Sequence, residues 1–189
     1  MKIGLYFGSF NPIHIGHLII ANYVLNSTDL EKIWLVVSPR NPFKPGNTLL
    51  NEYNRLHLVQ VAIEEDVRLK ASDVEFTLPK PSYTSVTLAH LTEKYPEHEF
   101  VIIMGGDSFQ NLSKWKNAEY ITDNFQIYVY PRPGFVLPAV HSANVTVVDA
   151  PLLQLSATGI RDFIKQGSSV RYMLPEKVRE EIEKSGYYK

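Results

Sequence analysis

The chain has 189 residues, of which 44% are hydrophobic, and a formal net charge of −1. This length and composition predict one compact domain with a sizeable core, and the charge balance argues against steering of a nucleic acid. The absence of cysteine excludes disulfides, thiolate nucleophiles and cysteine-ligated metals. The sequence shows no signal-peptide pattern and no run of about 20 apolar residues. A cytoplasmic protein with neither membrane nor nucleic-acid partners is therefore expected.

The first half of the chain alternates strand and helix patterns. The expected elements are a strand at 2–7, a helix at 16–27, a strand at 32–38, a helix at 51–65, extended segments at 67–72 and 74–77, and a helix at 85–95. The run at 32–38 is almost continuously apolar, as in a strand buried on both faces of a sheet. The apolar side of the first helix is expected to carry Leu18, Ile19, Tyr23 and Leu25.

The second half continues the same alternation and predicts a strand at 99–105, a helix at 117–125, strands at 126–130 and 145–150, and helices at 158–166 and 175–186. Pro175 is expected in the first turn of the last helix, with Gly186 just past its end. Strand–helix alternation at this spacing predicts an α/β fold, a Rossmann-like doubly wound, mainly parallel sheet with helices on both faces. We expect a single domain over 1–189, with C-terminal helices (about 158–186) packed on it.

Glycines, prolines and cations gather where strands end. Such clusters follow five of the predicted strands, at residues 8–17, 39–45, 105–115, 131–134 and 151–161. In an open parallel sheet, ligands bind outside the carboxyl ends of the strands, where the strand order reverses. The sequence therefore predicts one site at one edge of the sheet.

The first of these clusters can bind a phosphate. Gly8 permits close backbone approach, and Pro12 fixes the path of the loop. Free N–H groups near residues 15–17 would favour an anion, and His14 and His17 share a helix face. A metal site lacks a third ligand at suitable spacing, whereas two surface histidines without a ligand remain an alternative. The spacing by itself leaves phosphate binding and that alternative open.

Five ordered motifs resemble a known family. "GSFNPIHIGHL" resembles the nucleotidyltransferase signature, with H-x-G-H at 14–17, and "LSATGIR" (155–161) is similar to its late signature. Between them, "SPRNPFKP", "PSYTSVTLAHL" and "IIMGGDSFQNLSKW" are similar to the middle motifs of the nicotinate-nucleotide adenylyltransferases. The resemblance implies transfer of AMP from ATP to nicotinate mononucleotide, which yields deamido-NAD and pyrophosphate in NAD biosynthesis. It implies direct in-line attack without a covalent intermediate, with Mg²⁺ carried by the ATP phosphates and no metal held by side chains.

The resemblance also implies roles for individual residues. The catalytic residues would be His14, His17, Lys44 and Arg161. The residues implied for ATP are Gly8, Ser9, Phe10, His14, His17, Gly105, Asp107, Arg132, Ser156, Thr158 and Arg161. Those implied for the mononucleotide are Ser9, Asn41, Lys44, Ser82, Tyr83, Thr84, Asp107 and Trp115, with Trp115 stacked on the pyridine ring.

Several positions depart from the family pattern. Phe43 stands where a histidine is usual, Val86 where an aspartate is common, and Ala157 where the late motif has a second serine. These changes leave open whether the acceptor is the nicotinate or the nicotinamide mononucleotide. Two alternatives remain: an adenylyltransferase that uses another phosphate acceptor, and a non-catalytic nucleotide sensor of the same fold. The sequence also leaves open a homo-oligomer and the role of residues 131–144.

Overall fold

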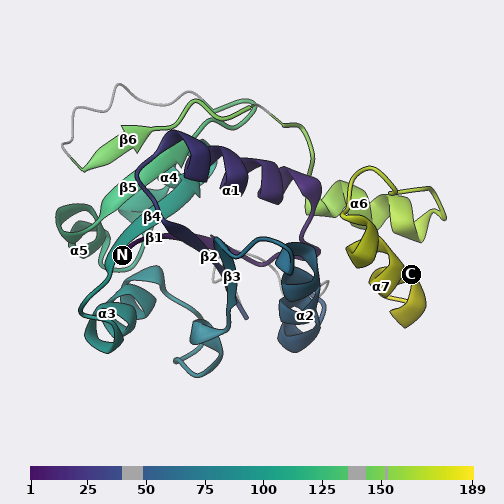
Figure 1. Ribbon diagram of the computed structural model, residues 1–189, viewed down its shortest axis with the longest axis horizontal. Helices are drawn as coiled ribbons and strands as arrows, with labels where there is room; N and C mark the ends of the chain where they lie inside the picture. Colours follow the sequence, from purple (N-terminus) through teal and green to yellow (C-terminus); the bar gives the residue numbers. More distant parts are fainter. Residues whose placement is uncertain (40–48, 136–143, 152) are drawn as a thin grey trace.

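The computed structural model describes residues 1–39, 49–135, 144–151 and 153–189. Within these residues, six parallel strands form one sheet in the order β3-β2-β1-β4-β5-β6 (Figure 1). Their bounds are β1 Lys2–Gly8, β2 Lys32–Val37, β3 Leu69–Ser72, β4 Glu99–Gly105, β5 Gln126–Tyr130 and β6 Val145–Val147. The strand order reverses between β1 and β4, as in doubly wound nucleotide-binding sheets. The predicted α/β fold is confirmed.

Helices cover both faces of the sheet because successive strand residues point to opposite sides. In β4, Val101 and Ile103 pack in the core beside α1 (Ile15–Ser27) and α2 (Glu52–Ile63). Ile102 and Met104 pack on the other face, beside α3 (Thr84–Lys94) and α5 (Ala118–Asn124). The short helix α4 (Gly106–Gln110) follows β4 directly. A buried strand between two helical layers explains the continuous apolar run at 99–105.

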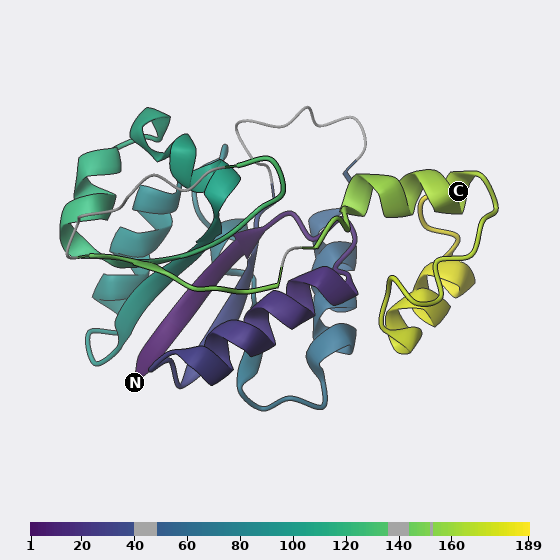
Figure 2. The ribbon, with the colours of Figure 1, turned by 90° about the horizontal axis from the view of Figure 1, so that it is seen from above.

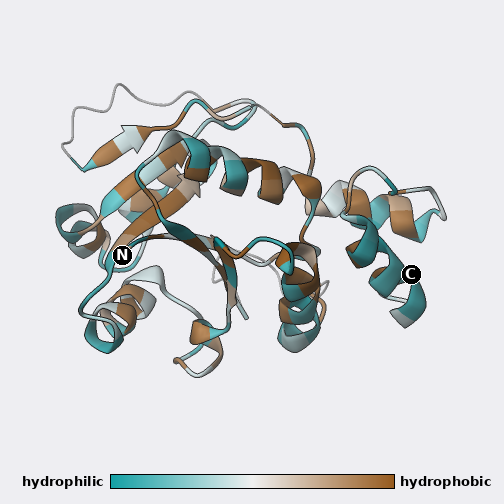
Figure 3. Cartoon of the chain, in the orientation of Figure 1, coloured by the Kyte–Doolittle hydropathy of each residue, from teal (hydrophilic) through white to brown (hydrophobic). Residues whose placement is uncertain are grey.

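The last two helices lie beside the carboxyl ends of the strands. Helices α6 (Ala157–Lys165) and α7 (Glu176–Ser185) stand together at one end of the molecule (Figures 1 and 2). Ile160, Val178 and Ile182 belong to the same buried cluster as α1 and α2. Most of α7 is hydrophilic, whereas the sheet is largely hydrophobic (Figure 3). Their narrow apolar stripe packs these helices on the core and leaves the other faces to water.

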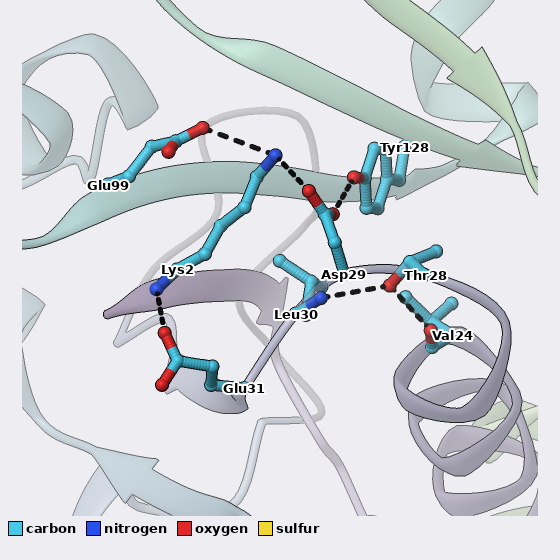
Figure 4. Close-up of polar contacts among 8 residues, drawn as sticks. All are labelled: Lys2, Val24, Thr28, Asp29, Leu30, Glu31, Glu99 and Tyr128. Atoms are coloured by element: carbon cyan, nitrogen blue, oxygen red, sulfur yellow. Dashed lines mark hydrogen bonds and ion pairs between the residues drawn. The ribbon is translucent and has the colours of Figure 1, made fainter.

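Polar contacts tie together the amino-terminal edge of the sheet, opposite the clusters of glycine and proline. The Lys2 ammonium lies 2.7 Å from Asp29 and 3.2 Å from Glu99, and the Tyr128 hydroxyl donates to Asp29 at 2.5 Å (Figure 4). These contacts join β1, β4 and β5 through the loop after α1. These polar groups pair with one another at the amino-terminal edge. The loops that could form a site lie at the opposite, carboxyl edge of the sheet.

Three local expectations were wrong. Residues Val74–Phe76 form a 3₁₀ helix (η2) rather than an extended segment, and the last strand stops at Val147. After β4 the chain forms α4 and the 3₁₀ helix η3 (Leu112–Lys114), two short elements that were not predicted from the sequence. Pro175 is the N-cap of α7 rather than a first-turn residue.

The buried face of α1 also differs from the prediction. Ile20, Ala21 and Val24 are buried along with Leu25, whereas Ile19 is 36% exposed. Helix α1 carries apolar residues on nearly every side, so its sequence period does not single out one face. The position of the sheet decides which face is buried. Among the described residues, no helix is long and apolar enough to cross a membrane.

Candidate active site

Two adjoining cavities lie at the carboxyl ends of β1 and β4, where the strand order reverses. The larger, about 510 Å³, is lined by Tyr6, Phe7, Gly8, Ser9, Phe10, Asn11, His14, His17, Leu49, Asp107, Ser108, Tyr130, Arg132, Leu155, Ser156, Ala157, Thr158 and Arg161. The smaller, about 100 Å³, is lined by Phe7, Gly8, Ser38, Glu75, Ser82, Tyr83, Thr84, Ser108, Trp115 and Lys116. We call them the nucleotide cleft and the ring pocket. They share Phe7, Gly8 and Ser108, so one ligand can extend from one into the other.

Tight packing around Gly8 shapes the boundary between the cavities. A Cβ atom at Gly8 would lie 2.9 Å from the Phe10 ring. Phe10 has a φ of 43°, is 1% exposed, and contacts the ring of His17 edge-on at 5.0 Å between centroids. Only glycine at position 8 leaves room for this ring. Gly8 thus serves the packing of Phe10, which in turn supports a histidine of the cleft.

The two histidines form a stacked pair at the start of α1. Their ring centroids are 3.7 Å apart with 26° between the planes, and the backbone N–H of His14 donates to Nδ1 of His17 at 3.2 Å. Because Nδ1 of His17 accepts this bond, its proton sits on Nε2. A Cβ atom at Gly16 would lie 3.0 Å from the His14 ring, so glycine in the H-x-G-H motif makes room for that ring. His17 can therefore act as a hydrogen-bond donor within the nucleotide cleft.

The expectation of free N–H groups at residues 15–17 was wrong for two of the three. The N–H of Ile15 donates to the carbonyl of Met173 at 3.0 Å, and that of His17 donates to the carbonyl of His14 at 3.0 Å. The C-terminal segment folds back onto the start of α1, a contact that local sequence cannot show. The donors of this part of the cleft are therefore chiefly side chains.

Burial keeps His14 neutral. Desolvation, aided by the positive charge of Arg132, lowers the pKa of His14 from 6.5 to about 4. His14 is 5% exposed, and its Nδ1 has no hydrogen-bond partner among the described residues. A neutral imidazole can still donate one hydrogen bond at neutral pH.

The lowered pKa of His14 predicts a loss of stability on acidification. Between about pH 6.5 and pH 4 the unfolded chain binds a proton that the folded chain does not, so stability falls as the pH falls through this window. In His14→Gln, the drop in unfolding free energy from pH 7 to pH 4 should be smaller by up to about 3 kcal/mol. Urea unfolding at several pH values measures this, with His90→Gln on α3 as control. Equal acid sensitivity of wild type and His14→Gln would contradict the assignment.

Two arginines line the nucleotide cleft and contact residues of neighbouring loops. Arg161 on α6 donates to the carbonyl of Asn11 at 2.7 Å and to the Thr158 hydroxyl at 3.3 Å. Arg132, after β5, lies 3.5 Å from Asp107. The guanidinium of Arg161 thus joins the late motif to the loop that carries the histidines, and both cations line one cleft.

Glycine and serine complete these walls. A Cβ atom at Gly105 would lie 2.5 Å from the Asp107 carboxylate and 2.9 Å from Arg132. The Ser156 hydroxyl accepts the N–H of Gly159 at 3.1 Å and caps α6. Gly105 therefore lies behind the cleft and leaves room for the Asp107–Arg132 pair rather than lining the cavity.

The predicted site residues divide between the two cavities. Those implied for ATP line the nucleotide cleft, except for Gly105. Ser82, Tyr83, Thr84 and Trp115, implied for the mononucleotide, line the ring pocket, whereas Ser9 and Asp107 line the cleft only. Asn41 and Lys44, also predicted as site residues, and Phe43, which departs from the family pattern, lie outside the described residues.

Sequence reasoning did not predict the role of Arg55, which holds the loops after β1 and β2 in place. Arg55, on α2, is 0% exposed and donates to the carbonyls of Leu50, Ser9, Ser38 and Pro39 at distances of 2.8, 2.5, 2.9 and 3.1 Å. These carbonyls belong to the loops after β1 and β2 and to the entry of α2. An arginine beside the apolar positions of a predicted helix was the available signal. Glu75, Ser108 and Lys116 of the ring pocket were missed as well.

Comparisons with known proteins agree with this geometry. The family model described as cytidylyltransferase-like matches residues 5–163. A protein of Flavobacterium johnsoniae named probable nicotinate-nucleotide adenylyltransferase is 51% identical, and one of Flavobacterium psychrophilum with the same name is 50% identical; each alignment covers 100% of both chains. The structure of Plasmodium falciparum nicotinic acid mononucleotide adenylyltransferase complexed with NaAD has a TM-score of 0.85 at 18% identity, covering 99% of this chain and 97% of that one. At such low identity, this last likeness shows a shared fold.

Proposed function

The chain belongs to the cytidylyltransferase-like family, among the nicotinate-nucleotide adenylyltransferases, and we propose that it transfers AMP from ATP to nicotinate mononucleotide. The products are deamido-NAD and pyrophosphate. The observation that carries the proposal is the pair of adjoining cavities, one rich in imidazole and guanidinium groups and one walled by aromatic rings. Such a pair can hold a triphosphate and a pyridine mononucleotide end to end.

The reaction needs no general base. A phosphate oxygen of the mononucleotide is already a nucleophile at neutral pH and attacks the α-phosphorus of ATP. The new P–O bond forms as the bond from the α-phosphorus to the bridging oxygen breaks, and pyrophosphate leaves with that electron pair. Catalysis then consists of positioning the two phosphates in line and stabilising the added negative charge.

The side chains of the cleft fit these two tasks. His17 donates from Nε2 to the α-phosphate, where charge accumulates in the transition state. Arg132 and Arg161 supply positive charge to the phosphates that leave as pyrophosphate. His14, neutral at physiological pH, supports the His17 ring through its stacking contact and its backbone N–H.

The Mg²⁺ that the reaction needs would arrive bound to the phosphates of ATP. Among the described residues, no group of three histidine, aspartate or glutamate side chains could hold a metal ion. Asp107 is the carboxylate that lines the cleft, and it already faces Arg132. Mg²⁺ would therefore be coordinated mainly by phosphate oxygens and water, and Asp107 is the cleft residue whose carboxylate could add a ligand.

A coupled assay tests the proposed function. Purified protein with Mg-ATP and nicotinate mononucleotide is expected to release pyrophosphate and form deamido-NAD in equal amounts, measured by chromatography. Binding of both substrates without turnover would favour a nucleotide sensor. Turnover only with a phosphate that lacks a pyridine ring would assign the protein to another acceptor.

Trp115→Ala is predicted to weaken binding of the mononucleotide. Trp115 lines the ring pocket but not the nucleotide cleft, and stacking of one base on an aromatic ring is worth about 1–3 kcal/mol. We expect the KM for the mononucleotide to rise about tenfold or more, with the KM for ATP changed far less. Steady-state kinetics with each substrate varied in turn measures the difference. A similar rise in both constants would argue against ring stacking.

A further inference from the structure

The ring pocket carries charged and polar groups that can distinguish an acid from an amide. Besides the rings of Trp115 and Tyr83, its lining includes the ionisable side chains of Glu75 and Lys116. Nicotinate carries a carboxylate on its ring, whereas nicotinamide carries an uncharged amide in the same place. The inference below rests on the proposed function and concerns which of these two rings the pocket prefers.

Lys116 holds a positive charge at the ring pocket. Its ammonium lies 4.5 Å from the centroid of the Tyr83 ring, a cation–π contact that favours a position beside the cavity although the residue is exposed. It forms no ion pair with any other residue that the structure describes. The ammonium can therefore pair with a ligand without first breaking a salt bridge.

The start of α3 adds to this positive potential. Tyr83, over which the Lys116 ammonium lies, is the N-cap of α3, an eleven-residue helix. The N-terminus of a helix carries a partial positive charge. Beside it, the Ser82 hydroxyl is buried in the pocket wall, next to the carboxyl group of Glu75. A cation, a helix start and a buried serine hydroxyl thus converge on one side of a small cavity.

Glu75 is the group of the pocket that could repel a ring carboxylate, and its burial reduces this repulsion. It is 1% exposed, its Oε1 accepts the Thr87 hydroxyl at 2.9 Å, and the Ser38 and Ser82 hydroxyls lie beside its carboxyl group. Burial raises the pKa of Glu75, which favours the neutral carboxyl relative to an exposed glutamate. Glu75 therefore opposes a ring carboxylate less than an exposed glutamate would.

We propose that Lys116 determines the preference of the ring pocket for a pyridine carboxylate over the corresponding amide. Its ammonium pairs with the ring carboxylate of nicotinate mononucleotide, supported by the start of α3 and the Ser82 hydroxyl. The amide offers no negative charge to this ammonium, so the interaction adds to binding of the acid alone.

The test compares kcat/KM for the nicotinate and nicotinamide mononucleotides in Lys116→Met. Methionine keeps an unbranched chain over the Tyr83 ring but removes the charge. We expect kcat/KM for the acid to fall about tenfold, the effect of one charge-assisted hydrogen bond, and that for the amide to stay within about twofold. Lys116→Arg should restore most of the preference. Lys114→Met is the matched control, because Lys114 is exposed two residues earlier and does not line the pocket.

The outcomes separate this inference from the proposed function. Wild-type protein that adenylylates neither mononucleotide would overturn both. Wild-type protein that is active, with an acid-to-amide ratio unchanged in Lys116→Met, would overturn the role of Lys116 and leave the proposed function in place. A ratio lowered equally by Lys114→Met would show a general effect of surface charge and would also overturn it.

Discussion

His17→Ala should lower kcat by about a hundredfold or more, the usual effect of removing one hydrogen-bond donor to a transition state. The structure supplies the reason. Nδ1 of His17 accepts the backbone N–H of His14, which leaves Nε2–H as the donor, and the ring lines the nucleotide cleft. Because the charge on the α-phosphate grows only during the reaction, KM for ATP should change much less than kcat. Steady-state and single-turnover rates with Mg-ATP and nicotinate mononucleotide measure both effects.

The matched control is His90→Ala, since His90 lies on α3 and lines neither cavity. It should leave kcat unchanged. A kcat for His17→Ala within about threefold of wild type would remove His17 from the mechanism. Circular dichroism of both variants checks that a lost rate reflects chemistry rather than unfolding.

Arg55→Met should destabilise the protein strongly. Arg55 is fully buried and donates to four backbone carbonyls, so methionine would leave these acceptors without their donor. Each unsatisfied buried polar group costs about 1–3 kcal/mol, and the total loss of unfolding free energy should be about 3 kcal/mol or more. Urea denaturation measures this loss. Arg55→Lys keeps the charge but not the planar fork, and should recover only part of it.

Replacement of Arg55 should also weaken the binding of both substrates, because the loops after β1 and β2 lose their common anchor. If Arg55→Lys folds, we expect raised KM values for ATP and for the mononucleotide. Arg68→Lys is the control. Because Arg68 pairs with Asp66 at the surface, this substitution should change the free energy of unfolding little. Full stability of Arg55→Met would show that water or other donors replace the guanidinium, which would contradict its role as an anchor.

Much of the architecture could be read from the sequence. Buried parallel strands appear as apolar runs, and the alternation of these runs with helical patterns predicts a doubly wound sheet. The site could be placed at one edge of the sheet, because Gly8, His14, Arg132 and Arg161 all follow predicted strands and parallel strands end on the same side. Each of these inferences depends on a short stretch of sequence, and so on local periodicity and turn chemistry.

Only the tertiary structure decided which groups meet. The carbonyl of Met173 accepts a hydrogen bond from the N–H of Ile15, and Arg55 donates to carbonyls of two loops. The Lys116 ammonium lies over the Tyr83 ring. These contacts join residues that are distant in sequence or lie on different elements, and their energies depend on burial. The packing of helices on the sheet determines which face of a helix such as α1 is buried. It also determines the neighbours of a residue, its loss of water and, as for His14, its pKa.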